Sequence, residues 1–147
     1  MKARVLLLSI FILSTAATFS QTKTVPKSII STDAVIKKYH DLDELKSKQK
    51  GELLELYIER IKVLVKTLPY VAFATKPGVT TTDIGIPNDS DNKKVIDTQT
   101  ENTASYLEST IEFQKKLLPY SDKDNLIAAI LFYENIMKSL HEFEGLN

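Results

Sequence analysis

The stretch LIAAILFYENIMKSLHEF, residues 126–143, decides the fold. Its large apolar side chains recur at steps of three and four residues, which places them on one face of an α-helix. That face holds Leu126, Ile130, Tyr133, Met137 and Leu140, and it is broadened by Leu131, Phe132, Ile136 and Phe143. We therefore expect a buried helix that lies at the centre of the fold. The uninterrupted apolar run, residues 126–133, is far shorter than the roughly 20 residues that a membrane span needs.

Two more long helices are predicted from the same period, over residues 42–68 and 91–118. Pro69 and Pro119 end them, because the residue before a proline is disfavoured in the α-helical conformation. The linker after Pro119 is short, so the helix that contains residues 126–143 is expected to return antiparallel. Residues 97–105 of the middle helix have no large apolar side chain, so this stretch is either exposed or faces something polar.

A short helix is expected at the start of the domain. It begins near residue 32 and places Val35, Ile36 and Tyr39 on one face. Asp41 and Glu44 have the spacing of a capping box. The chain therefore either bends near residues 40–43, which we favour, or runs on directly into the next helix.

Residues 70–91 form the longest segment without a helical period. Pro77 and Gly78 fit the two central positions of a type II turn, whose twist does not suit a tight hairpin. We expect an irregular ordered loop, with a hairpin or a loop that crosses the bundle from end to end as alternatives. The predicted fold class is all-α: an antiparallel helical bundle of three long helices plus a short N-terminal helix, with a long ordered loop at about 70–91.

The first twenty residues have the layout of a secretory signal peptide. Lys2 and Arg4 form a basic start, residues 5–19 are mostly apolar, and small residues suit cleavage before Gln21, with cleavage after Ala17 as the alternative. The apolar stretch is shorter than a membrane span of roughly 20 residues, so a cleaved signal is favoured over an anchor. The predicted organisation is a signal peptide at 1–20, a flexible lead-in at 21–31 and a single helical-bundle domain at 32–147.

We therefore expect an exported protein that is periplasmic or extracellular, soluble, and without stable membrane insertion once the signal is removed. The chain has no cysteine, which excludes a lipoprotein anchor, disulfides and thiolate metal sites. Without Lys2 and Arg4, 17 basic residues stand against 19 acidic ones, and Arg60 is the sole arginine. A nucleic-acid binder is expected to be basic with clustered charges. No nucleic-acid partner is therefore expected.

No motif for catalysis or metal binding stands out. A di-iron bundle needs Glu-x-x-His on two helices, but a lysine precedes both His40 and His141 by three residues. The chain also lacks a zinc-protease motif, a nucleophile elbow and a glycine-rich phosphate loop. Acidic stripes such as Glu52, Glu55 and Glu59 fit the solvated side of a helix better than a cation site. We expect no cofactor, no metal ligand, no catalytic residue and no enzymatic activity.

The remaining candidate is a binding surface formed by the loop and the polar half of the middle helix. Its predicted residues are Phe73, Ile84, Ile86, Gln99, Thr100, Thr103 and Tyr106. The three polar residues at 99, 100 and 103 either project into solvent, which we favour, or face inward around a small polar pocket.

The leading functional hypothesis is an exported non-catalytic helical interaction module that binds a protein or a wall or surface component, for example as an inhibitor or immunity protein. One alternative is a carrier of a small ligand or metal in the bundle interior. The other is an enzyme without a recognisable motif.

Overall fold

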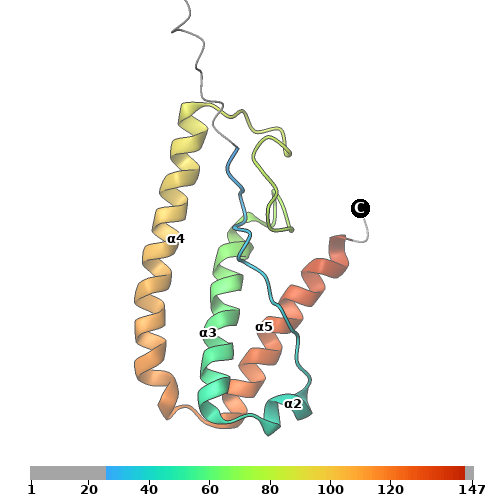
Figure 1. Ribbon diagram of the computed structural model, residues 1–147, viewed down its shortest axis with the longest axis vertical. Helices are drawn as coiled ribbons and strands as arrows, with labels where there is room; N and C mark the ends of the chain where they lie inside the picture. The colour runs from blue at the N-terminus through green and yellow to red at the C-terminus, as the bar shows by residue number, and fades with distance from the viewer. Residues whose placement is uncertain (1–25, 145–147) are drawn as a thin grey trace, which may run out of the picture.

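The computed structural model describes residues 26–144, which are predominantly helical (Figure 1). The helices are α2 (Leu42–Ser47), α3 (Lys50–Thr67), α4 (Ser90–Leu117) and α5 (Lys123–Glu144), and short 3-10 helices, η2 (Leu68–Tyr70) and η3 (Leu118–Tyr120), follow α3 and α4. No strand occurs between residues 26 and 144, so the prediction of an all-α chain is confirmed. The predicted signal peptide lies outside the described residues. Within them, no helix combines the length and apolar character that a membrane crossing requires.

Helix α3 packs against both other long helices, α4 on one side and α5 on the other (Figure 1). The chain runs along α3, turns through the loop at one end, and returns antiparallel along α4. It then turns again after η3, so that α5 runs in the same general direction as α3. The central position expected for the C-terminal helix is therefore taken by α3.

The expected short helix near residue 32 is not formed. Residues 34–40 form no helix, and residues 34–36 alternate between buried and exposed side chains: Ala34 and Ile36 are buried, while Val35 is 47% exposed. The short helix of the structure is α2, and Asp41 and Glu44 form its capping box through reciprocal side-chain to backbone hydrogen bonds of 2.8 and 3.2 Å. The chain then breaks at residues 48–49, so the helix predicted over 42–68 is split into α2 and α3.

The segment before α2 is held against the loop. The backbone N–H of Ile29 donates to the carbonyl of Val79 over 2.9 Å, and the N–H of Gly78 donates to the carbonyl of Ile30 over 3.1 Å. Ile30 is fully buried. In its described part, residues 26–31, the lead-in expected to be flexible is therefore paired with the loop and packed.

The loop between α3 and α4 is ordered and irregular, as favoured. It neither forms a hairpin nor crosses from one end of the helices to the other, because it joins neighbouring ends of α3 and α4 (Figure 1). Gly78 has a φ of 90°, the left-handed conformation that the third position of a type II turn requires. The turn predicted at Pro77 and Gly78 is thus supported by the backbone.

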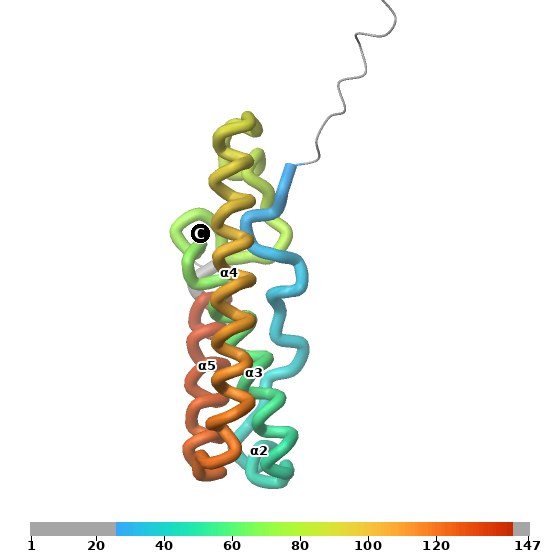
Figure 2. The backbone as a smooth tube through the Cα atoms, turned by 90° about the vertical axis from the view of Figure 1, so that its left-hand side faces the viewer, coloured from blue at the N-terminus to red at the C-terminus, as the bar shows by residue number. Residues whose placement is uncertain are grey.

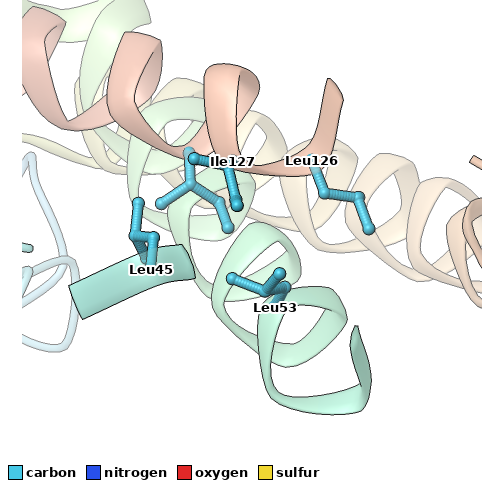
Figure 3. Close-up of a cluster of buried hydrophobic side chains, with 5 residues drawn as sticks. Leu45, Leu53, Leu126 and Ile127 are labelled. Carbon is cyan, nitrogen blue, oxygen red and sulfur yellow. The ribbon is translucent and has the colours of Figure 1, made fainter. Parts of the chain in front are cut away.

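Three clusters of buried apolar side chains make up the core. The first joins α2, α3 and α5 through Leu45, Leu53, Leu126, Ile127 and Ile130 (Figure 3). The second is centred on Ile36, Val63, Leu64 and Met137, and the third on Ile29, Ile30 and Ala34 beneath the loop. Helix α4 contributes to none of these clusters, and Leu107 is its one buried residue. Of the three long helices, α4 therefore has the fewest buried side chains.

Candidate functional site

Three adjoining pockets lie around the N-terminal half of α4. The first, of about 350 Å³, is enclosed by the N-terminal segment and α4, with Ser28, Ile29, Thr100, Thr103 and Leu107 in its walls. The second, of about 190 Å³, is enclosed by the loop and the start of α4, with Phe73, Ile86, Val95 and Gln99 in its walls. Tyr70 lines both of them.

The third pocket opens between α3 and α4 and has a volume of about 400 Å³. Leu64, Val65 and Leu68 form its α3 wall, and Gln99, Thr103 and Tyr106 form its α4 wall. Because Gln99 also lines the second pocket and Thr103 the first, the three pockets adjoin along one stretch of helix. We call residues 95–107 of α4 together with these pockets the pocket surface.

The structure brings six of the seven predicted binding residues to the pocket surface. Phe73, Ile86 and Gln99 meet in the second pocket, Thr100 and Thr103 line the first, and Tyr106 lines the third. Ile84 instead packs against the cluster of buried residues beneath the loop. Gln99 and Thr100 are exposed, as the favoured projection into solvent predicts, and Thr103 is half-buried, while all three border the pockets.

The alternative prediction of a small polar pocket is not supported, because little polar character is found in the pocket walls. The Oγ1 of Thr100 donates to the carbonyl of Ile96 over 2.7 Å, and the Oγ1 of Thr103 donates to the carbonyl of Gln99 over 2.8 Å. Each hydroxyl proton is therefore used within α4, and the threonine methyl groups remain to form the wall. The pocket walls are mostly apolar as a result.

Ion pairs fix the N-terminal segment beside the first pocket. Lys27 Nζ lies 2.7 Å from Asp97 of α4, and Lys66 Nζ of α3 lies 2.6 Å from Asp33. The hydrogen bond from each lysine lowers the pKa of its aspartate partner, so Asp97 and Asp33 are ionised at neutral pH. Since both lysines that line this pocket are already paired, neither offers a free charge to an anionic ligand.

Two aromatic rings stand out at the rim. Phe73 and Tyr106 are each 57% exposed, although each also lines a pocket. An exposed ring beside an apolar pocket is a common feature of protein-binding surfaces, because aromatic side chains contribute a large contact area at low entropic cost. The surface thus combines apolar pockets with exposed aromatic rings.

A second polar feature lies inside the core, between α3, α5 and the segment before α2. Arg60 is 1% exposed, Glu134 is fully buried and His40 is 8% exposed. The Glu134 Oε1 atom accepts from Arg60 Nε over 3.0 Å and from Arg60 Nη2 over 2.6 Å. Its Oε2 atom accepts from the backbone N–H of His40 over 2.7 Å. Arg60 Nη2 also donates to the carbonyl of Lys38 over 2.7 Å.

This cluster is built to hold a carboxylate in its ionised form. Burial raises the pKa of Glu134, but the hydrogen bonds from His40 and Arg60 and the charge of Arg60 outweigh burial and lower it overall. The His40 Nδ1 atom lies 3.1 Å from Glu134 Oε1 and 3.2 Å from Arg60 Nη2. None of the pockets described above is lined by these three residues. The cluster therefore ties the segment before α2 to α3 and α5.

The sequence interpretation missed the cluster, although two signals pointed to it. Arg60 is the sole arginine after the first twenty residues, and it follows Leu53 at the helical spacing of seven. Glu134 lies four residues after Ile130 and three before Met137, on the apolar face of α5. His141, by contrast, lies at the surface, with its Nδ1 atom 3.4 Å from the hydroxyl of Tyr39. Across residues 26–144, no three His, Asp or Glu side chains are placed to hold a metal ion.

Comparisons with known proteins give no indication of function. No protein-family model matches the chain, and no curated protein and no solved structure shows significant similarity to it.

Proposed function

We propose that this protein is a non-catalytic interaction module that binds a partner protein or a wall or surface component through the pocket surface. The observation that carries the proposal is the coincidence of three apolar pockets with the exposed rings of Phe73 and Tyr106. Contiguous exposed apolar surface on a small domain is a common mark of a protein interface. An inhibitor or immunity protein is one form that such a module takes.

The poor anchoring of α4 supports this placement. Over its 28 residues, α4 has one buried side chain, and its first half rests on the loop and the N-terminal segment with pockets between. A partner that filled these pockets would bury apolar surface that the isolated chain leaves open to water, at about 25 cal/mol for each Å². Binding is thus expected to stabilise α4 as well as the complex.

Photo-crosslinking in the native host tests the proposal. A crosslinking amino acid is placed at Phe73 or at Tyr106, and a matched variant carries it at Glu101, an exposed position on another side of α4. The expected result is one defined crosslinked partner from positions 73 and 106 and none from position 101. The same pattern of products from all three positions, or no product at all, would contradict the pocket surface as the binding site.

Export is part of the same proposal, with residues 1–20 acting as a cleaved signal peptide. The basic start and the apolar stretch of the N-terminal sequence support export. N-terminal sequencing of the protein recovered from its host is expected to begin at Gln21. A first residue of Met1 or Lys2 would argue for a retained segment instead.

The second candidate function is binding of a small apolar ligand in the first pocket. Its volume of about 350 Å³ lies at the lower end of the roughly 300–1,000 Å³ typical of ligand pockets. This location differs from the carrier hypothesis, which placed the ligand in the bundle interior. Native mass spectrometry of the protein from its host is expected to show an added mass that a Leu107→Trp substitution removes, if the pocket carries such a ligand.

A further inference from the structure

The three long helices share an apolar face that no described segment covers. On α4 it is an uncharged stripe in the second half of the helix, at the helical steps of three and four: Tyr106, Thr110, Phe113 and Leu117. The matching stripe of α3 is Tyr57, Ile61, Val65 and Leu68, and that of α5 is Ala129, Tyr133, Ile136 and Leu140. Residues at such steps lie on one side of a helix.

Contacts between the helices show that the three stripes lie on the same side. The third pocket places Tyr106 of α4 across from Val65 and Leu68 of α3. The hydroxyls of Tyr57 of α3 and Tyr133 of α5 lie 3.2 Å apart, and their ring centroids are separated by 5.5 Å. We call this surface the uncovered face.

The opposite side of the helices is covered by the segment that precedes α2 (Figure 2). This segment contacts residues outside the three stripes: Lys27 pairs with Asp97 of α4, and Asp33 pairs with Lys66 of α3. On α5, Lys138 Nζ lies 5.2 Å from the ring centroid of Tyr39. Among residues 26–144, the N-terminal segment thus packs against one side of the helices, and the side that carries the three stripes stays exposed.

The uncovered face exposes large aromatic side chains. Tyr106 and Phe113 of α4 are 57% and 56% exposed, and Phe132, whose ring lies 5.8 Å from that of Tyr133 at the edge of the face, is 61% exposed. Taking about 200 Å² for a whole aromatic side chain, these three rings expose roughly 350 Å². That is nearly half of the about 800 Å² per partner that a standard interface buries. Leu68 and Leu117, 43% and 50% exposed, extend the patch.

We propose that the uncovered face is the interface of a homodimer, in which it packs against the same face of a second copy of this chain. In a two-fold dimer the residues near the axis meet their own copies, so a charged residue there would face a like charge. The three stripes contain no charged residue, whereas 26% of the whole chain is charged. An apolar, uncharged face is therefore self-complementary in a way that the rest of this surface is not.

The proposal does not rest on partner binding at the pocket surface, although Val65, Leu68 and Tyr106 belong to both surfaces. The test therefore uses Phe113 and Phe132, which line none of the pockets described above. A double variant with Phe113→Glu and Phe132→Glu places four carboxylates in a two-fold interface. The matched control, Ser105→Glu with Asn135→Glu, adds the same charges to the same helices at exposed positions outside the stripes.

Analytical ultracentrifugation from micromolar to submillimolar protein measures the outcome. The unmodified protein and the control are expected to sediment with twice the mass of one chain, and the Phe113→Glu, Phe132→Glu variant with the mass of one chain. A monomeric unmodified protein, or equal masses for the variant and the control, would overturn the proposal.

Because an added charge can also affect folding, the variant must retain the circular dichroism spectrum of the unmodified protein. A second measurement needs no substitution: hydrogen exchange of the unmodified protein at low and high concentration. Segments 106–117 and 129–140 are expected to gain protection as the concentration rises, while segment 42–47 of α2 is not. Protection that does not change with concentration contradicts the dimer.

Discussion

Replacing Glu134 by glutamine is expected to destabilise the fold more than any surface substitution. The carboxylate receives two hydrogen bonds from Arg60 on one oxygen and the backbone N–H of His40 on the other. Glutamine has a single acceptor oxygen, so its NH₂ group must face either the guanidinium or the N–H of His40, donor against donor. In addition, the charge of Arg60 loses its buried partner.

The magnitude follows from the burial of both groups. Arg60 is 1% exposed and Glu134 is fully buried, and removing one member of a buried ion pair costs about 3–5 kcal/mol because the other charge stays behind. Single domains have unfolding free energies of about 5–15 kcal/mol, so roughly a fifth or more of the total is expected to be lost. Glu142→Gln, on the exposed end of the same helix, is the matched control and should change stability by less than about 0.5 kcal/mol.

Urea denaturation followed by circular dichroism measures both variants. A third protein, with Arg60→Met and Glu134→Leu together, distinguishes the buried charge from lost contacts. This double variant still leaves the carbonyl of Lys38 and the N–H of His40 without their present partners. Its loss of stability should nevertheless be smaller than the summed losses of Arg60→Met alone and Glu134→Leu alone, because no buried charge is left without a partner. If Glu134→Gln unfolds at the same urea concentration as Glu142→Gln, the cluster does not hold the fold and the reasoning is wrong.

Three further outcomes are expected. The pKa of Glu134 is lower in the folded state than its usual 4.5, so its contribution to stability is present above pH 4.5 and is lost as the pH falls through the folded-state pKa. Urea titrations at a series of acidic pH values should show this loss of stability in the unmodified protein and a weaker loss in Glu134→Gln. Burial, assisted by the hydrogen bond with Tyr133, raises the pKa of Tyr57 to about 12. Ultraviolet titration of Tyr133→Phe should therefore find Tyr57 ionising at lower pH, yet still above 10, since burial persists, and an unchanged curve would contradict the contact. Tyr70 packs against the cluster beneath the loop, whereas Tyr120 is 87% exposed. Urea denaturation should therefore show a loss of stability of about 1–3 kcal/mol for Tyr70→Ala and of less than about 0.5 kcal/mol for Tyr120→Ala. Equal losses for the two variants would refute this distinction.

The long helices were predictable because their signals are local. Pro69 and Pro119 stop α-helical geometry by sterics alone, and each lies within a short 3-10 helix of the same sequence, Leu-Pro-Tyr. The position of the short helix was not predictable in this way. The sequence of residues 34–36 is compatible both with a non-helical segment whose side chains alternate between buried and exposed and with one face of a helix. Only the packing of Ile36 against α3 and α5 distinguishes these two structures.

The two candidate sites differ in how far the sequence reveals them. The pocket surface was predictable in outline, because a run without large apolar residues beside a long loop marks a helix that cannot pack closely. The place of Thr100 and Thr103 in the wall of the first pocket was not, because it depends on where the N-terminal segment lies. The pairing of Arg60 with Glu134 required the contact between α3 and α5, although each residue lies at a core spacing of its own helix.

Helix α4 connects the two proposals through its energetics. A helix of 28 residues is about 42 Å long, and in water most helical stability comes from burying an apolar face rather than from intrinsic propensity. With Leu107 as its one buried residue, α4 obtains little of that stability from its own chain. The pocket surface lies over its first half, and the exposed Phe113 and Leu117 lie on its second half. Partner binding at the pocket surface and dimerisation through the uncovered face would therefore supply, on successive turns, the burial that α3 alone does not provide.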